Sequence, residues 1–430
     1  MTEPERPKFA ILLRYAPFGL PLAFGALPVY LLLPHLYATR YGLSLGGVGL
    51  LLLLTRLGDA VIDPLIGRWS DAWAARHGAR VGLIAWGLLP LALSFYFLFN
   101  PLRSLPIWWS LAPALIAFYV AYSVSGLNYQ AMAAELSTQY QARSWLTTAR
   151  EGAALIGVLL AAILPELLQR HLPAQAAWQA FALVFVVLLF FAAIPLWNRS
   201  LRRPVAVTSQ RAWWRFYEPL RRPATRRLFA VYTLSQSANT VAATLFFFFV
   251  DQILRAPHWA PGFLLLYFLS GAAGMPFWLW YSHRQSKARA WRWAMLLATF
   301  AFLGAVLLGP GLLWGYALVC LFSGLALGAD QALPPSILAD HTDADPDARA
   351  GSYFGLYNWV GKAATAIGAG LILPLLQWLG YSVEGQNLWA LLLGYALVPA
   401  LFKLWAIYLL QPERVDRAAL RFTTLSGAHP

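Results

Sequence analysis

Long apolar stretches, separated by short polar loops, recur along the whole 430-residue chain. Twelve of them reach the roughly 20 residues that a helix needs to cross a bilayer core. Because a backbone in lipid must satisfy its own hydrogen bonds, each stretch is predicted to be a helix. The sequence therefore predicts an all-α membrane protein with twelve transmembrane helices. They are expected near 10–37, 43–67, 81–100, 107–130, 146–168, 177–198, 228–253, 262–282, 293–310, 313–338, 353–378 and 388–410.

The composition supports a membrane protein. Hydrophobic residues make up 60% of the chain and charged residues only 12%, about half the charged share of a typical soluble domain. The single cysteine, Cys320, lies inside an apolar stretch, so neither an intrachain disulfide nor a cysteine-based metal site is expected.

The net charge of +14 follows the topology of the chain and does not indicate nucleic-acid binding. With the N-terminus inside, basic residues concentrate in the loops predicted to be cytoplasmic, above all between 199 and 227. The predicted outer loops hold only Arg40, Arg103, Arg170 and Arg255. By the positive-inside rule, both termini are expected in the cytoplasm, and a bacterial inner membrane is the expected location.

The helices are expected to form two halves. The predicted parts are a first six-helix half at 1–198, a basic cytoplasmic linker at 199–227, a second half at 228–411 and a tail at 412–430. A weak internal repeat relates the halves: Glu135 is followed after eight residues by Arg143, and Asp340 after nine by Arg349. Two parallel six-helix repeats are typical of major-facilitator transporters, whose binding site lies between the halves.

The second predicted helix contains three ionisable residues in "TRLGDAVIDPLIG": Arg56, Asp59 and Asp63. The two aspartates are four residues apart and share one helix face. Because charge in lipid is costly, this face should look into the protein interior or a wet cavity. Two close carboxylates repel each other, so a bound proton or a hard cation such as Na⁺ would stabilise them. The alternative is that Arg56 neutralises an aspartate and locks two helices together.

The same stretch resembles the motif R-x-x-D-A-x-x-D-P-x-x-G of the glycoside–pentoside–hexuronide:cation symporters, the melibiose-carrier family. "YATRYGLSL", "LADHTDAD" and "YNWVGKAATAIGAG" are similar to the same family, so the resemblance covers both halves. It implies that Asp59 and Asp63 bind the coupling cation and that Lys362 lies beside the cation and sugar sites. On physical grounds, Lys362 needs a carboxylate partner in its apolar helix, and Asp59 or Asp63 is the expected one; a purely structural salt bridge is the alternative.

The resemblance is incomplete in the substrate region. The melibiose carrier has acidic residues in its first and fourth helices, and both are absent from "APFGLPLAFGALPVYLLL" and "YSVSGLNYQAMAAEL". The helix 5 arginine is retained as Arg150. Asp330 precedes Pro334 and Pro335, where a break or kink is expected. The predicted cavity residues are Asn128, Tyr129, Gln130, Arg150, Asp330, Asn358 and Trp359.

The loop after the second helix, "GRWSDAWAARHGAR", resembles the signature loop of the major facilitator superfamily. A solvated basic loop is the alternative. With the acid–arginine repeat, the loop gives the predicted gating residues, which are Asp71, Arg76, Arg80, Glu135, Arg143, Asp340 and Arg349.

An enzyme and a channel are both unexpected, because no nucleotide, zinc-protease or hydrolase motif and no pore signature is found. We expect a monomeric secondary transporter in contact with membrane lipid, without cofactor, nucleic acid or metal other than Na⁺. It is expected to carry a small organic solute, a sugar or glycoside, with Na⁺ or H⁺ by alternating access. A symporter of an amphiphilic solute and a proton-coupled exporter are the alternatives.

Overall fold

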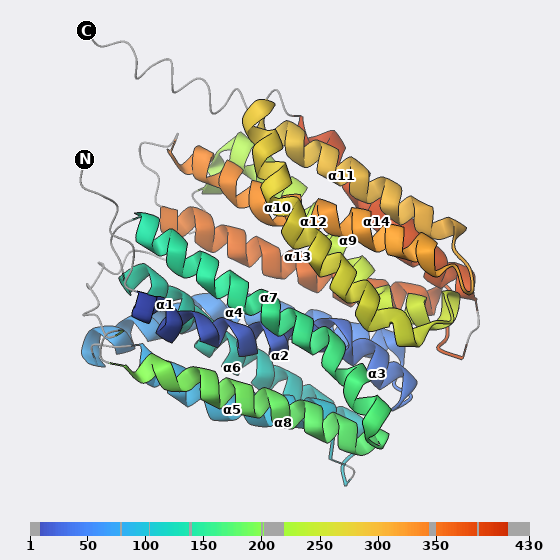
Figure 1. The fold of residues 1–430 in the computed structure, drawn as a ribbon, viewed down its shortest axis with the longest axis horizontal. Coiled ribbons are helices and arrows are strands. Elements are labelled where there is room, and N and C mark those ends of the chain that lie inside the picture. The colour runs from blue at the N-terminus through green and yellow to red at the C-terminus, as the bar shows by residue number, and fades with distance from the viewer. Residues whose placement is uncertain are drawn as a thin grey trace. The chain divides into compact units, whose positions relative to one another are not determined.

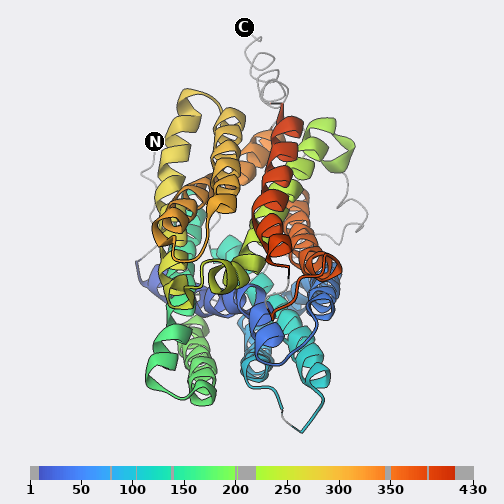
Figure 2. The ribbon, with the colours of Figure 1, turned by 90° about the vertical axis from the view of Figure 1, so that its right-hand side faces the viewer.

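The computed structural model describes residues 9–77, 80–102, 104–136, 140–198, 201, 219–343, 350–384 and 387–411. Within these residues the regular elements are helices, without strands (Figures 1 and 2). Twelve of the helical stretches are long and apolar enough to cross a membrane, as the sequence predicts. Proline occurs inside many of them, including both Pro334 and Pro335 in one helix, because neighbouring helices can compensate for the lost backbone bonds.

The chain divides into two compact units. The first comprises residues 1–33 and 55–209, and the second comprises 34–54 and 210–430. The linker predicted at 199–227 contains the junction near 209. The segment 34–54 differs from the predicted division, since it precedes the linker but packs with the second half. The predicted domain boundaries otherwise stay predictions, and the 412–430 tail lies outside the described residues.

The first unit contains the helices that surround the predicted cation site. Its helices α2 and α7 pack together, and α5 packs against α6 and α8. The sequence places phenylalanines at the buried faces of these helices, and Phe24, Phe95 and Phe185 form one aromatic cluster. The elements of this unit are α1 (Phe9–Tyr15), η1 (Ala16–Phe18), α2 (Gly19–Leu31), α5 (Val81–Phe99), α6 (Ile107–Leu136), α7 (Tyr140–His171), α8 (Ala174–Ala193), η2 (Ile194–Trp197) and the larger part of α4 (Leu45–His77).

The second unit contains the last six spans together with the short helix α3 (Leu33–Thr39) and the first ten residues of α4. Helix α9 packs against α13 and α14, and α12 packs against α10 and α11. The elements from residue 210 onwards are α9 (Pro223–Phe248), η5 (Phe249–Ile253), η6 (Pro257–Trp259), α10 (Ala260–Arg284), α11 (Lys287–Gly304), η7 (Ala305–Leu307), α12 (Leu313–Asp343), α13 (Ala350–Trp378) and α14 (Leu388–Leu410).

Helix α12 runs through Pro334 and Pro335 as one continuous helix. The break that was one of the two expectations at the double proline is therefore not present, and the kink that was the other stays a prediction. Without a break, the polar residue Asp330 is held on a regular helical face and can be reached by side chains from neighbouring helices.

Candidate functional site

Asp59 lies on α4 within the first unit, and only 8% of the residue is exposed. The Ser123 hydroxyl on α6 donates a hydrogen bond to Asp59 Oδ1 at 2.5 Å. A hydroxyl bonded to an ionised carboxylate forms a short, strong hydrogen bond. Asp63 lies one turn further along the same continuous helix and is partly exposed. The two carboxylates therefore have different environments on one helix face, while their role as cation ligands stays a prediction.

Arg56 lies one turn before Asp59, next to two aromatic rings. Its guanidinium carbon is 5.6 Å from the centre of the Tyr30 ring on α2 and 5.4 Å from that of Tyr119 on α6. Cation–π attraction of this kind strengthens where water is excluded. The two tyrosines were not among the predicted site residues, because they lie on other helices and approach Arg56 only through tertiary contacts.

A second basic residue, Arg150, faces the same region of the first unit. Its guanidinium donates to Glu151 Oε1 at 2.5 and 3.1 Å. Tyr122 on α6 lies within electrostatic reach of Asp59, Arg56, Arg150 and Glu151. Tyr122 was not among the predicted site residues.

Asn128, a predicted cavity residue, is fully buried. Its Oδ1 accepts a hydrogen bond of 2.5 Å from the Ser70 hydroxyl, and its Nδ2 donates to the Val124 carbonyl at 2.7 Å. Ser70 in turn accepts a hydrogen bond of 2.6 Å from Arg80 Nη1. Asn128 and the predicted gating residue Arg80 therefore belong to one buried polar chain that joins α4 to α6.

Tyr129 and Gln130 follow Asn128 on α6 but differ in exposure. Tyr129 is 1% exposed and stacks on Tyr15 with ring centres 4.5 Å apart. Its hydroxyl donates to the Tyr15 carbonyl at 2.9 Å. Gln130 is exposed. In this conformation the Tyr129 ring packs on Tyr15 of the protein itself, and the roles of both residues in substrate binding stay predictions.

The remaining predicted gating residues are only partly described. Arg76 is exposed. Asp340 on α12 pairs with Lys287 at the start of α11, with nitrogen–oxygen distances of 2.6 and 2.7 Å. This lysine partner was not predicted. The side chains of Asp71, Glu135 and Arg143, and the whole of Arg349, lie outside the described residues.

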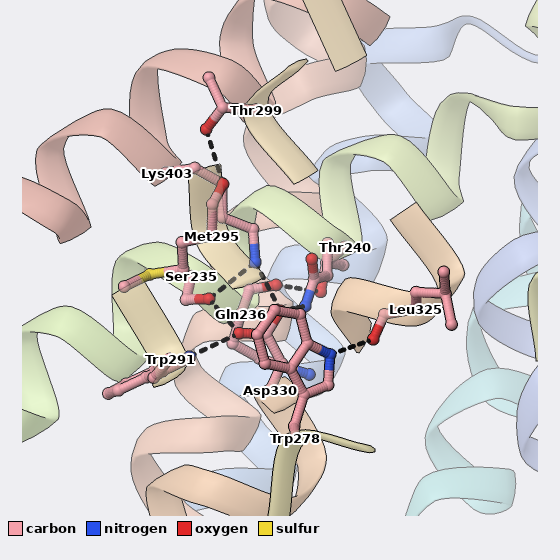
Figure 3. A network of polar contacts seen from close by, with 11 residues as sticks. Ser235, Gln236, Thr240, Trp278, Trp291, Met295, Thr299, Leu325, Asp330 and Lys403 are labelled. Carbon is pink, nitrogen blue, oxygen red and sulfur yellow. Dashed lines mark hydrogen bonds and ion pairs between the residues drawn. The ribbon is translucent and has the colours of Figure 1, made fainter. Parts of the chain in front are cut away.

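The second unit contains a buried charged network centred on Asp330 (Figure 3). Lys403 Nζ on α14 lies 2.5 Å from Asp330 Oδ2, and the two side chains are 0% and 4% exposed. Asn239 on α9 donates to the same oxygen at 2.9 Å. Ser235 on α9 and Trp291 on α11 each donate to Oδ1 at 2.8 Å. The Asp330 carboxylate thus accepts hydrogen bonds from residues on three neighbouring helices. Its place in the wall of a cavity stays a prediction.

Lys403 is the main charged residue that the sequence interpretation missed. It is a single lysine within the apolar stretch "LWALLLGYALVPALFKLWAIYLL". The argument applied to Lys362, that a cation in an apolar helix needs a carboxylate, applies equally to Lys403. It would have predicted a carboxylate partner for Lys403, although the choice of Asp330 depends on the tertiary contact.

Helix α13 carries three predicted site residues with different exposure. Lys362 and Trp359 are partly exposed, and Asn358 is exposed. Just before them, Tyr357 stacks on Tyr232 of α9 at 4.3 Å, which fixes this part of α13 against α9. The pairing of Lys362 with Asp59 or Asp63 stays a prediction.

Comparison with known proteins assigns the chain to a family. Residues 15–416 match the family described as MFS/sugar transport protein. A putative glycoside/cation symporter of Escherichia coli, YagG, is 41% identical over 69 residues, 15% of each chain. An uncharacterised symporter of Synechocystis is 27% identical over 192 residues, covering 42% of this chain and 34% of that protein. Major facilitator superfamily domain-containing protein 12 of Homo sapiens is 32% identical over 131 residues, 28% of this chain and 27% of that protein.

These matches span about a third or less of the relatives' own lengths. The fold itself is similar over almost the whole chain to a solved structure. The crystal structure of a bacterial homologue of the human lysosomal transporter Spinster matches with a TM-score of 0.66 and 13% identity, over 97% of this chain and 99% of that one. The family match places the chain among MFS transporters and not among enzymes. This integral membrane protein belongs to the MFS/sugar transport protein family of the major facilitator superfamily.

Proposed function

We propose that the protein is a secondary transporter that carries a small organic solute together with Na⁺ or H⁺ by alternating access. The observation that supports this most directly is the buried carboxylate of Asp59, held by Ser123 and followed one turn later by Asp63. An intramembrane carboxylate is costly and is by default a candidate for a functional role such as binding an ion or a proton. The resemblance of this stretch to cation symporters, and the match to a putative glycoside/cation symporter, support the same proposal.

For the solute, we propose a sugar or glycoside. The family description and the relative from Escherichia coli support this class. Gln130 and Asn358 are the exposed amides among the predicted cavity residues, and they offer both donors and acceptors to hydroxyl groups.

An amphiphilic solute is the second candidate. The observation that favours it is the loss of polar groups from the predicted cavity wall: Asn128 and Tyr129 are buried in contacts within the first unit. A less polar wall suits an apolar tail.

The coupling ion is tested by the thermal stability of the purified protein. A ligand that binds only the folded state raises stability by about 2.7 kcal/mol at a hundred times its Kd. We would measure melting curves with Na⁺, Li⁺, K⁺ or choline as chloride salts at equal ionic strength, from pH 5.5 to 8.5. The variants are Asp59→Asn and Asp63→Asn, with Glu166→Gln, an acid paired with Arg170 at 3.3 Å on α7, as the control.

We expect Na⁺ or Li⁺ to raise the melting temperature of the wild type and of Glu166→Gln. Neither salt should raise the melting temperature of Asp59→Asn or Asp63→Asn. A rise that depends on pH alone and is lost in both variants identifies protons as the coupling ion. If the melting temperature of the wild type responds neither to Na⁺ or Li⁺ nor to pH, the two aspartates have a structural role. That result contradicts the proposed mechanism.

The solute is then tested with proteoliposomes. With an inward gradient of the identified ion, uptake of neutral glycosides is compared with uptake of lysophospholipids. Accumulation of glycosides only supports the first candidate, and accumulation of lysophospholipids only supports the second.

A further inference from the structure

The segment 34–54 is held tightly on the second unit. The Gly46 backbone N–H donates to Gln377 Oε1 on α13 at 2.5 Å. Gly49 is so close to α13 that an added Cβ would lie 2.6 Å from the Pro374 ring. Small residues thus let the start of α4 approach α13 closely, as they do in other membrane helix pairs.

At the other end of this segment, His35 on α3 faces Asp251. His35 Nε2 lies 3.6 Å from Asp251 Oδ2, which is too long for a hydrogen bond. The nitrogen is buried and has no hydrogen-bond partner among the described residues. The imidazole ring packs edge-on against Phe248 at 4.9 Å and lies 5.8 Å from Phe247. A buried polar nitrogen aimed at a carboxylate just beyond bonding distance is a site where a proton would complete the contact.

Asp251 belongs to the π-helical turn η5, which ends the seventh span. π-Turns are rare and frequent at functional sites. The neighbouring Gln252 fixes this turn: its Nε2 donates to the Val383 carbonyl at 2.8 Å, and its Oε1 accepts from the Tyr381 hydroxyl at 2.9 Å. Asp251 is therefore carried by an anchored turn.

The neighbouring tyrosines do not titrate near neutral pH. Burial raises the pKa of Tyr381 and the nearby Asp251 carboxylate raises it further. Burial also raises the pKa of Tyr37, with a smaller contribution from Tyr41 on the same segment. Histidine is the side chain whose ordinary chemistry lets it change charge between pH 5 and 8.

We propose that His35 and Asp251 form a proton-binding site that clamps the segment 34–54 onto the second unit. Protonation gives His35 a positive charge and a donor at Nε2, which then bonds to Asp251 Oδ2. Side-chain exposures of 18% for His35 and 41% for Asp251 let water-borne protons reach the site. The site lies on the side of the membrane predicted to be extracytoplasmic, so the clamp would respond to external pH. Its residues are other than Asp59 and Asp63, on which the proposed coupling depends.

The test is hydrogen–deuterium exchange of the full-length protein in nanodiscs, measured on peptides that cover 33–45 at pH 5.5 and pH 8.0. Protection factors are corrected for the intrinsic pH dependence of exchange. The variants are His35→Gln, Asp251→Asn and His35→Arg, which carries a permanent charge. His171→Gln, at the exposed end of α7, is the matched control.

We expect the wild type and His171→Gln to be about two- to fivefold more protected at pH 5.5, the range that a partly exposed ion pair supplies. His35→Gln and Asp251→Asn should lose this pH dependence, and His35→Arg should be protected at both pH values. A pH-independent wild type, or a pH dependence retained in His35→Gln, overturns the proposal. If His35→Gln does not fold, the proposal is tested by the pH dependence of protection in Asp251→Asn and His35→Arg. Asp59→Asn should keep the pH dependence even if it abolishes coupling, so the two proposals fail separately.

Discussion

Lys403 Nζ lies 2.5 Å from Asp330 Oδ2, in a place where both side chains are almost entirely buried. The carboxylate also accepts hydrogen bonds from Ser235, Asn239 and Trp291, as Figure 3 shows for Ser235 and Trp291. The pair therefore ties α12 to α9, α11 and α14. A buried ion pair adds little net stability compared with a well-packed apolar pair, but either charge alone is costly.

This relationship predicts the effect of neutralising one partner. Asp330→Asn leaves the Lys403 ammonium buried without a counter-ion, and Lys403→Met leaves the carboxylate. Each single variant should lose about 3–5 kcal/mol of stability, measured as a large fall in melting temperature in detergent.

The double variant Asp330→Asn/Lys403→Met serves as the control. It leaves no uncompensated charge, so its melting temperature should lie above that expected from adding the two single losses. Strict additivity would show that the two residues do not stabilise each other.

The number of helices could be predicted from the sequence because lipid imposes both their length and their hydrogen bonding. The pair Asp59 and Asp63 could be predicted because a helix places residues four apart on one face. Partners from other helices, such as Ser123, Lys403 and Lys287, depend on tertiary contacts that a single helix does not contain. The placement of 34–54 with the second unit is likewise a packing result, since the segment is contiguous in sequence with the first half.

A second prediction concerns the hydrogen bond to Asp59. Ser123→Ala removes the hydroxyl that donates to Asp59 Oδ1. If Asp59 binds the coupling cation, the less restrained carboxylate should bind it several-fold more weakly, which titration of melting temperature against Na⁺ measures.

Ser125→Ala is the matched control for this substitution. Ser125 lies on the same helix and is buried, and its hydroxyl has no hydrogen-bond partner among the described residues. Equal cation affinity in the two variants would show that Ser123 does not act through Asp59.

A third prediction tests close packing in the first unit. A Cβ added at Gly157 on α7 would overlap the Leu20 carbonyl on α2, whereas one added at Gly152 meets nothing within 4 Å. Because backbone cannot yield as a side chain can, Gly157→Ala should cost about 1–3 kcal/mol. Gly152→Ala should melt at or slightly above the wild-type temperature, since alanine favours a helix. Similar melting temperatures for the two variants would contradict the close contact between α2 and α7.

The last prediction separates structural from substrate-binding roles on α6. Asn128 and Gln130 are two residues apart, but Asn128 is fully buried between Ser70 and Val124 and Gln130 is exposed. Asn128→Ala removes the acceptor of the Ser70 hydroxyl and leaves that buried donor without its partner, which costs about 1–3 kcal/mol. It should therefore lower the melting temperature in the absence of solute.

Gln130→Ala removes an exposed amide and should leave that melting temperature within about 0.5 kcal/mol of the wild type. If Gln130 lines the solute site, the same variant should raise the KM for uptake in proteoliposomes, where Asn128→Ala should mainly reduce the amount of folded transporter. The opposite result would be a wild-type KM in Gln130→Ala and a raised KM in a folded Asn128→Ala variant. It would show that Asn128, and not Gln130, binds the solute. The buried asparagine would then face the solute in another conformation of the transport cycle.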